Sequence, residues 1–537
     1  MSTPRNCATV VLTASLLLAT PTVAAPHADG DGNSGTRVVV TDSGPVRGIA
    51  TPTMYAFLGI PYAAAPVSES RWRPPRPHAR WHTPLDARQF GNACAQSPTL
   101  LGGGVPSAAE DCLFLNVFAL PAQGNDDSKS RPVMVFIHGG GLTEGASNAY
   151  DPTKFVQEGV VVVTINYRLG ILGFLTHPAL TAESPDGASG NYGLMDQQFA
   201  LRWVQNNIAH FGGDPNNVTI FGESAGGLSV HSNLVSPTAA GLFQKAISES
   251  GSYSLTQPTL AAAESLGTAF ATLAGCGSQT AACLRALPVA TVLAVQDVVL
   301  AHVNLVPTVD GKVLTLSLGA AFASGQFNRV PVIEGTNHDE YRAFVATTEL
   351  TAGTPLTATG YIPAIETTLG VSPTVATFLG TDVYPLAAYP PSSTAPSIAL
   401  GALGTDAIFA CNARLVSGLL VPYVPTYQYE FNDPNAPLPI GVSVSFPGGA
   451  YHASELQYLF DPAHLGFPGL STEQAELSDA MVRYWTRFAR NGDPNSEEGP
   501  YWPPYGPSDE FQSLEPPTPM TKATFALDHK CAFWGSF

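Results

Sequence analysis

A serine inside a glycine-rich turn is the residue of this sequence best placed to act as a nucleophile. Ser224 lies in residues 221–227 (FGESAGG), after a β-branched run typical of a buried strand and before a stretch that favours a helix. Gly222 and Gly226 flank it at the two positions where a side chain would collide within so sharp a turn. The pattern predicts an exposed serine between strand and helix, although G-x-S-x-G alone also occurs in ordinary glycine-rich turns.

An acyl-transferring serine needs amide donors for the oxyanion that develops on the substrate. Residues 132–137 (PVMVFI) form a continuous apolar run, as in a central strand covered on both faces, and the sequence HGGG follows directly. Glycines there leave backbone N–H groups unshielded, so we expect an oxyanion hole from residues 139–141, completed by the N–H of Ala225. A plain flexible loop is the alternative for these glycines, and His138 fits a structural role better than a catalytic one.

The elements that must position these groups alternate between strands and helices. A buried strand is predicted at 160–165, an amphipathic helix at 193–208, and then the strand that leads to Ser224. This order is the crossover of a parallel sheet, so the fold class is α/β.

Composition and charge limit the possible partners. The chain has 537 residues and a formal net charge of −18, which repels phosphate backbones and anionic membrane surfaces, so neither nucleic acid nor a membrane is expected as a partner. Residues 1–25 have a positive start, a short apolar run and small residues for cleavage, as in a secretory signal. We expect a secreted protein, extracellular or periplasmic, with a disordered linker at 26–37 and a single domain at 38–537.

Export would make the cysteines informative, because disulfides persist in oxidising compartments. Seven cysteines are present, and one of them, Cys7, would leave with the signal. Local pairing joins Cys94 to Cys112 and Cys276 to Cys283, which leaves Cys411 with Cys531. A metal site among them is the alternative, but no C-x-x-C spacing or accompanying histidine cluster supports it, so no metal and no cofactor are expected.

Many ordered segments together resemble the type-B carboxylesterase/lipase family, which includes the cholinesterases. They include FLGIPYA, EDCLFLNV, HGGG, GNYGLMDQ, FGGDPNNVTIFGESAGG, GTNHDE and YHASELQYLF, and the resemblance runs from about residue 38 to 537. It implies an α/β-hydrolase fold, with a large, mostly parallel central sheet flanked by helices and helical insertions around the active site. It also implies a Ser-His-Glu triad with Ser224 as nucleophile and oxyanion donors at Gly140, Gly141 and Ala225.

The resemblance places the other triad members on Glu340 and His452. Carboxylates follow a predicted strand in residues 334–340 (EGTNHDE), where the crevice of such a sheet is expected, and Asp339 remains the alternative acid. His452 fits the chain order serine, acid, histidine. Ser250 resembles a serine of the family that supports the triad, with an ordinary loop serine as the alternative. The helical, proline-rich stretch at about 344–406 is expected to wall the site, unless it is a free linker.

The loop between Cys94 and Cys112 bears on the substrate. In family lipases the corresponding loop is a long amphipathic lid, and in cholinesterases it carries a tryptophan for choline, whereas here it is short and has no aromatic residue. Leu142 also stands where relatives often have an aromatic. We therefore expect a broad esterase for short- to medium-chain or aromatic esters. A lipase for longer acyl chains and a non-catalytic binding protein are the alternatives, and the oligomeric state is left open.

Overall fold

One large mixed sheet organises the computed structural model, which describes residues 35–98, 105–121, 130–300, 305–389, 393–497 and 499–536. The expected signal at 1–25 lies outside the described residues. The sheet has 13 strands in the order β1-β2-β3-β5-β7-β6-β8-β9-β10-β11-β12-β13, with β4 beside β2. They are β1 (Gly35–Val40), β2 (Pro45–Ala50), β3 (Tyr55–Pro61), β4 (Leu85–Asp86), β5 (Phe114–Ala119), β6 (Arg131–Ile137), β7 (Val161–Ile165), β8 (Gly213–Glu223), β9 (Lys245–Glu249), β10 (Val332–Asn337), β11 (Thr426–Phe431), β12 (Phe511–Leu514) and β13 (Met520–Lys522).

Strand direction divides the sheet into a parallel centre and antiparallel edges. The strands from β7 through β6, β8, β9, β10 and β11 to β12 pair in parallel. Strands β1, β2, β3 and β5 at one edge and β13 at the other pair antiparallel. The carboxyl ends of β8, β10 and β11 therefore lie side by side, where the crevice of a parallel sheet forms. The α/β class and the mostly parallel sheet predicted from the sequence are confirmed.

Alternation along the central strand assigns the helices to two faces. Val133, Val135 and Ile137 of β6 pack into one core cluster with α4 (Tyr192–Asn207), α5 (Ala225–Val235), α9 (Leu318–Ser324) and α14 (Cys411–Leu420). Met134 and Phe136 pack into the other cluster, with α1 (Thr153–Gln157), α15 (Leu456–Leu459) and α16 (Thr472–Asn491). Both faces are buried, which explains why the sequence of β6 is continuously apolar.

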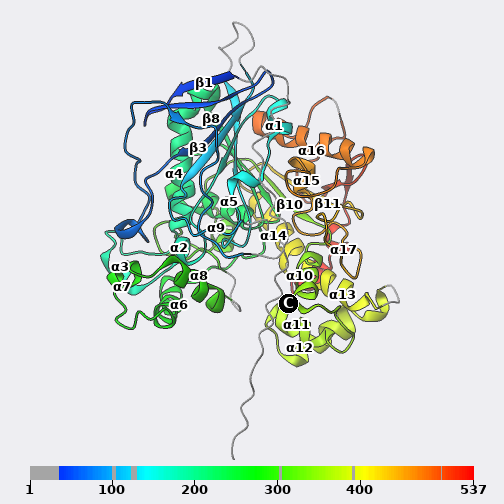
Figure 1. Cartoon of the computed structure of the whole chain (residues 1–537). Helices are drawn as coiled ribbons and strands as arrows, with labels where there is room; N and C mark the ends of the chain where they lie inside the picture. The colour runs from blue at the N-terminus through cyan, green and yellow to red at the C-terminus, as the bar shows by residue number, and fades with distance from the viewer. Residues whose placement is uncertain are drawn as a thin grey trace, which may run out of the picture.

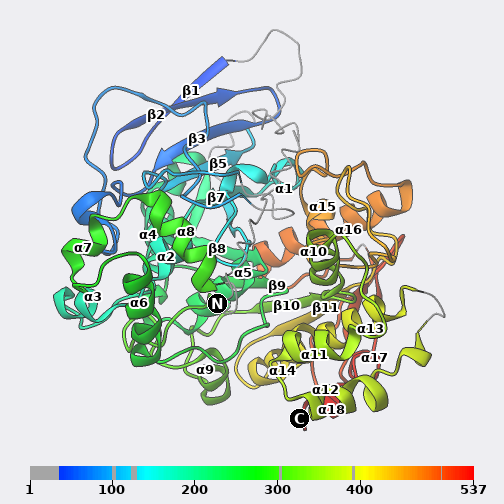
Figure 2. The same ribbon diagram turned by 60° about the horizontal axis from the view of Figure 1, so that its bottom comes forward.

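Two groups of helices extend away from the sheet and lie on opposite sides of the molecule in both views (Figures 1 and 2). One comprises α2 (Gly170–Phe174), α3 (Pro178–Glu183), α6 (Leu260–Leu273), α7 (Ala281–Arg285) and α8 (Val289–Val299). The other comprises α10 (Arg342–Ala352), α11 (Tyr361–Leu369), α12 (Pro373–Phe378) and α13 (Ala395–Gly404), and it has its own apolar core. The second group corresponds to the stretch expected at about 344–406.

One long helical run is apolar enough to resemble a membrane span. Residues 395–420 join α13, the π-helical turn η8 (Thr405–Ala410) and α14, and 61% of their most apolar window is buried inside the protein. This burial matches the core helix of a folded domain.

The start of the sheet differs from the prediction. Strand β1 begins at Gly35, because residues 35–40 pair in continuous register with β2, from Gly35 opposite Ala50 to Val40 opposite Pro45. The last three residues assigned to the linker at 26–37 therefore belong to the sheet, and the rest of that linker lies outside the described residues. An alternation of apolar and polar residues could not reveal this part of the strand, since β1 lies at the edge of the sheet and is exposed at all positions but Val39.

Three disulfides join the cysteine pairs expected from spacing: Cys94–Cys112, Cys276–Cys283 and Cys411–Cys531. The last connects the start of α14 to α18 (Cys531–Trp534), beyond α17 (Phe525–Asp528), and so ties α18 to the helical run at 395–420.

We expect the Cys411–Cys531 bond to stabilise the fold most. It closes a loop of 120 residues, against 7 for Cys276–Cys283, so chain entropy predicts losses of about 4–5 and about 2–3 kcal/mol when the pairs are replaced by serine. Urea titration of the two double serine variants measures the free energies of unfolding. An equal loss in both, or a free thiol in the folded mature protein, contradicts this expectation.

Candidate active site

Ser224 occupies a strained turn at the junction of β8 and α5. Its φ of 56° and ψ of −120° are rare for a residue with a side chain, and its N–H donates to the backbone oxygen of Glu249, 2.8 Å away. A Cβ on Gly226 would lie 1.9 Å from the oxygen of Ile137, and one on Gly222 would lie 2.5 Å from the same atom. A side chain at either glycine would therefore collide with the end of β6, which lies beneath the turn. Ser224 itself is left partly exposed.

The glycines after β6 lie beside this serine. A Cβ on Gly139 would approach the Cβ of Ser224 to 3.1 Å, and Gly140 and Gly141 have φ of +95° and +60°. Within the described residues, the amides of Gly140, Gly141 and Ala225 donate no hydrogen bond to a protein acceptor. Unpaired amides next to a serine can hold a developing oxyanion.

Two neighbours of this loop have structural roles. His138 is buried and stacks on Tyr167, and burial lowers its pKa to about 4, so the ring is neutral at physiological pH. Leu142 is smaller than the aromatic residue that relatives often have at this position. It is fully buried in the core, so the difference in size does not by itself open a space for the acyl group.

Glu340 and His452 form a short hydrogen bond at the carboxyl ends of β10 and β11. The ring Nδ1 of His452 lies 2.5 Å from Oε2 of Glu340. The other oxygen, Oε1, accepts three hydrogen bonds, from Ser250 Oγ at 2.5 Å, Thr336 Oγ1 at 2.8 Å and the backbone N–H of Asn337 at 2.7 Å. This set fixes the carboxylate, which in turn fixes the imidazole ring.

Asp339, the alternative acid, is occupied elsewhere. Its Oδ1 pairs with Arg342 at 2.9 Å, and its Oδ2 accepts the N–H of Ala450 at 3.1 Å. It makes no contact with His452 among the described residues, so its role is to brace the two loops that carry Glu340 and His452.

Glu223 is a buried carboxylate that the sequence analysis did not single out. Its Oε1 lies 3.2 Å from Nε2 of His452 without forming a hydrogen bond. Burial would lower the pKa of His452, but the charges of Glu223 and Glu340 and the Glu340 hydrogen bond raise it to about 9. Within the described residues, Ser224 Oγ and His452 form no hydrogen bond, a contact that often tightens only when substrate is bound.

Two more glutamates are buried behind Glu223. Glu249 accepts the indole N–H of Trp485 at 2.8 Å, and burial raises its pKa to about 8. Glu455 accepts Asn337 Nδ2 at 2.5 Å, and burial and the neighbouring carboxylates raise its pKa well above the usual range. Glu249 directly precedes Ser250, and Glu455 follows His452 by three residues. These positions beside predicted site residues were the signals in the sequence that could have indicated the two glutamates.

Aromatic side chains cover the outer side of His452. Phe344 of α10 and Phe409 of η8 each place a ring 5.1 Å from the imidazole, and they stack on one another at 5.8 Å. Phe344 also stacks on Tyr341 and is 37% exposed. The helical stretch at 344–406 and the turn after it therefore border the site and present an apolar surface there.

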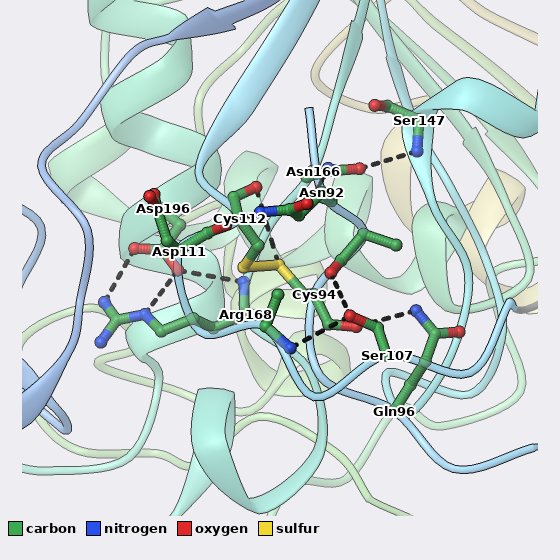
Figure 3. Close-up of a disulfide and its surroundings, with 12 residues drawn as sticks. Asn92, Cys94, Gln96, Ser107, Asp111, Cys112, Ser147, Asn166, Arg168 and Asp196 are labelled. Carbon is green, nitrogen blue, oxygen red and sulfur yellow. Dashed lines mark hydrogen bonds and ion pairs between the residues drawn. A yellow bond between two sulfur atoms is a disulfide. The ribbon is translucent and has the colours of Figure 1, made fainter. Parts of the chain in front are cut away.

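The Cys94–Cys112 disulfide, drawn in Figure 3, closes a loop that is tied to the segment after β6. Gln96, two residues after Cys94, donates to the oxygen of Gly145 and accepts its N–H, at 3.0 and 2.9 Å. Asn166 connects the same region by donating to the oxygen of Asn92 and accepting the N–H of Ser147. Residues 99–104, which belong to the same stretch of sequence, lie outside the described residues.

Comparison with known proteins agrees with this arrangement. Residues 35–534 match the Carboxylesterase family. The chain is 35% identical over 485 residues to a fumonisin B1 esterase from Sphingopyxis macrogoltabida, covering 86% of this chain and 83% of that protein. It is 35% identical over 487 residues to an acylcarnitine hydrolase from Mus musculus, covering 86% and 83%, and 34% identical over 511 residues to a cocaine esterase from Homo sapiens, covering 90% and 87%. The chain therefore belongs to the carboxylesterase family, has its α/β-hydrolase fold, and is a carboxylic ester hydrolase.

Proposed function

We propose that the protein is a secreted carboxylic ester hydrolase of broad specificity that acts through Ser224, His452 and Glu340. The observation that carries this proposal is the hydrogen-bonded series Ser250, Glu340 and His452, which ends beside the strained turn of Ser224. His452 takes the proton of Ser224 as Ser224 attacks the ester carbonyl, and it passes that proton to the departing alcohol, which leaves the acyl-enzyme. Water activated by the same histidine then hydrolyses the acyl-enzyme, releases the acid and returns the proton to Ser224.

The remaining groups have supporting roles in this mechanism. The amides of Gly140, Gly141 and Ala225 stabilise the oxyanion, because they directly follow Gly139 and Ser224, which lie side by side, and have no protein acceptor among the described residues. Ser250 holds Glu340 and so acts as a positioning residue. No step calls for a cofactor, and within the described part of the chain the only grouping of possible metal ligands, His338, Glu430 and His529, shares no residue with the proposed triad.

Export is part of the proposal. The three disulfides favour an oxidising compartment, and residues 1–25 have the composition of a secretory signal.

Replacing the serine or the histidine should remove nearly all turnover. We expect Ser224→Ala and His452→Ala each to lower kcat by about 10⁴-fold or more, since nucleophile and base act as a unit. Hydrolysis of p-nitrophenyl butyrate measures the loss, and fluorophosphonate labelling should disappear in Ser224→Ala. A non-catalytic binding protein would show neither turnover nor labelling in the unaltered chain.

The two carboxylates should differ sharply. In Glu340→Gln, the amide oxygen will keep the three donors at Oε1, so the NH₂ group will face Nδ1 of His452 and force the proton onto Nε2. That tautomer cannot accept the serine proton, and kcat should fall by about 10³–10⁴-fold. Asp339→Asn, the matched control, should keep most of the activity. Equal losses in both folded variants would leave the acid unassigned.

The pH dependence should report the charge of Glu223. His452 must be neutral to act as a base, so activity falls as pH drops through its pKa. Because this pKa is raised, the acidic limb of the pH–activity profile should lie above pH 6.5. Glu223→Gln removes one cause of the rise and should move the limb to lower pH. Glu249→Gln, a buried control that does not contact His452, should leave it in place.

The measurement is kcat/KM for ethyl butyrate in a pH-stat. A limb at or below pH 6.5 in the unaltered enzyme, or an equal shift in both variants, would contradict the assignment of Glu223.

Substrate preference should follow the exposed apolar surface of Phe344, which the buried ring of Phe409 supports from behind. This surface suits apolar or aromatic ester groups, while the described part of the Cys94–Cys112 loop offers neither a lid nor an aromatic ring for a cation. The names of the relatives cover fumonisin B1, acylcarnitine and cocaine, so family membership does not choose among esters.

We expect p-nitrophenyl butyrate to be hydrolysed faster than the palmitate, and butyrylcholine no faster than its uncharged isostere 3,3-dimethylbutyl butyrate. Initial rates with these pairs, and with tributyrin on both sides of its solubility limit, test the preference. A jump in rate when tributyrin separates as droplets would indicate a lipase instead.

A further inference from the structure

Two histidines and a glutamate from three distant segments meet next to the loop that carries Glu340. His338 follows β10, Glu430 lies in β11, and His529 follows α17, and one ligand atom from each lies within 4.8 Å of the other two. Parallel pairing explains part of this meeting: Thr336 is opposite Glu430, and the N–H of His338 donates to the oxygen of Phe431. The rings of His338 and His529 have centroids 5.3 Å apart.

Each histidine has a carboxylate at its Nδ1. His529 Nδ1 lies 2.7 Å from Asp406 Oδ1, and His338 Nδ1 lies 3.3 Å from Asp339 Oδ1. Asp406 is itself held by Tyr384 Oη at 2.6 Å, and Asp339 by Arg342. Histidines that bind metal typically use one ring nitrogen while the other contacts a carboxylate, which fixes the tautomer and the ring orientation. With Nδ1 of each ring held in this way, Nε2 is the atom of each ring that could bind a shared ligand, and Nε2 of His529 already faces Glu430.

We propose that His338, Glu430 and His529 bind a divalent zinc ion. Two imidazole nitrogens and one carboxylate oxygen are a donor set that zinc accepts, and hard cations such as Ca²⁺ and Mg²⁺ prefer oxygen ligands alone. Bonds of about 2.0–2.1 Å put tetrahedral ligand atoms about 3.3 Å apart, so small side-chain rotations close the group around an ion. His529 Nε2 and Glu430 Oε1, now 2.5 Å apart, separate to admit it.

The surroundings define what the ion would do. Glu430 and His529 are buried, whereas His338 is 38% exposed at its side chain, so the ion enters from that side and keeps one position for water. The ion would connect the loop of Glu340, the centre of the sheet and the last helices of the chain. None of the three ligands contacts Ser224 or His452 among the described residues, so the site is structural.

The rival arrangement needs no metal. Burial would lower the pKa of His529, but its hydrogen bonds to Asp406 and Glu430, with the charges of both, raise it to about 10. In that arrangement a charged His529 forms ion pairs with Asp406 and Glu430, and His338 pairs with Asp339 alone. Ion pairs then hold these side chains together without a metal.

The test uses the full chain without a polyhistidine tag. Metal is stripped with dipicolinate, and zinc is added back and counted by plasma mass spectrometry after gel filtration. We expect one zinc per chain in the unaltered protein and less than about one tenth in His338→Ala and Glu430→Gln, since the loss of one of three ligands removes most of the affinity. His82→Ala, which changes an exposed histidine elsewhere, should keep the full content.

Thermal unfolding gives a second readout that does not depend on activity. Zinc in excess should raise the Tm of the unaltered protein and of His82→Ala by about 3 °C and leave the two ligand variants unchanged, and Ca²⁺ or Mg²⁺ should have no effect. Substoichiometric zinc with an unchanged Tm in the unaltered protein overturns the proposal and leaves His529 as a charged bridge. Zinc retained equally by His338→Ala and Glu430→Gln overturns it as well, because the ion would then bind elsewhere.

Discussion

The contact between two backbones at the centre of the sheet constrains the whole site. The first turn of α5 passes so close to the end of β6 that Gly226 has no room for a Cβ above the oxygen of Ile137. This close passage forces the sharp bend that leaves Ser224 with a positive φ, and it brings the glycines after β6 beside the serine. Ser224 and the glycine amides beside it are therefore positioned by one packing requirement, which neither strand nor helix could satisfy alone.

A second constraint is electrostatic. Glu223, Glu249, Glu340 and Glu455 are buried near one another, and burial of unpaired charges is costly. The structure limits this cost in two ways. Glu340 accepts three hydrogen bonds at one carboxylate oxygen and faces His452 with the other, whereas burial raises the pKa of the other three glutamates, to about 7 for Glu223, so that protonation is easier. The charge beside His452 therefore depends on groups that titrate near neutral pH.

Sequence reasoning succeeded where the signal was local. The turn at Ser224, the apolar run of β6 and the helix α4 all have periodicities or spacings that one segment carries by itself. It could not reveal Glu223 beside His452, or the grouping of His338 with Glu430 and His529, because those contacts depend on which strand ends are neighbours. It also misplaced the start of β1, since a strand at an exposed edge has no apolar face to give it a pattern.

The Cys411–Cys531 disulfide can form only late in synthesis, after Cys531 has been made. A ribosome makes Glu340 and Cys411 long before His529 and Cys531, so the loop that carries Glu340 must wait for α17 and α18 before its neighbours are complete. A nascent chain that stops short of His529 would expose a free thiol at Cys411 and leave Asp406 and Glu430 without their common partner. A chain in which Cys411 and Cys531 are joined has therefore also acquired the histidine that Asp406 and Glu430 share.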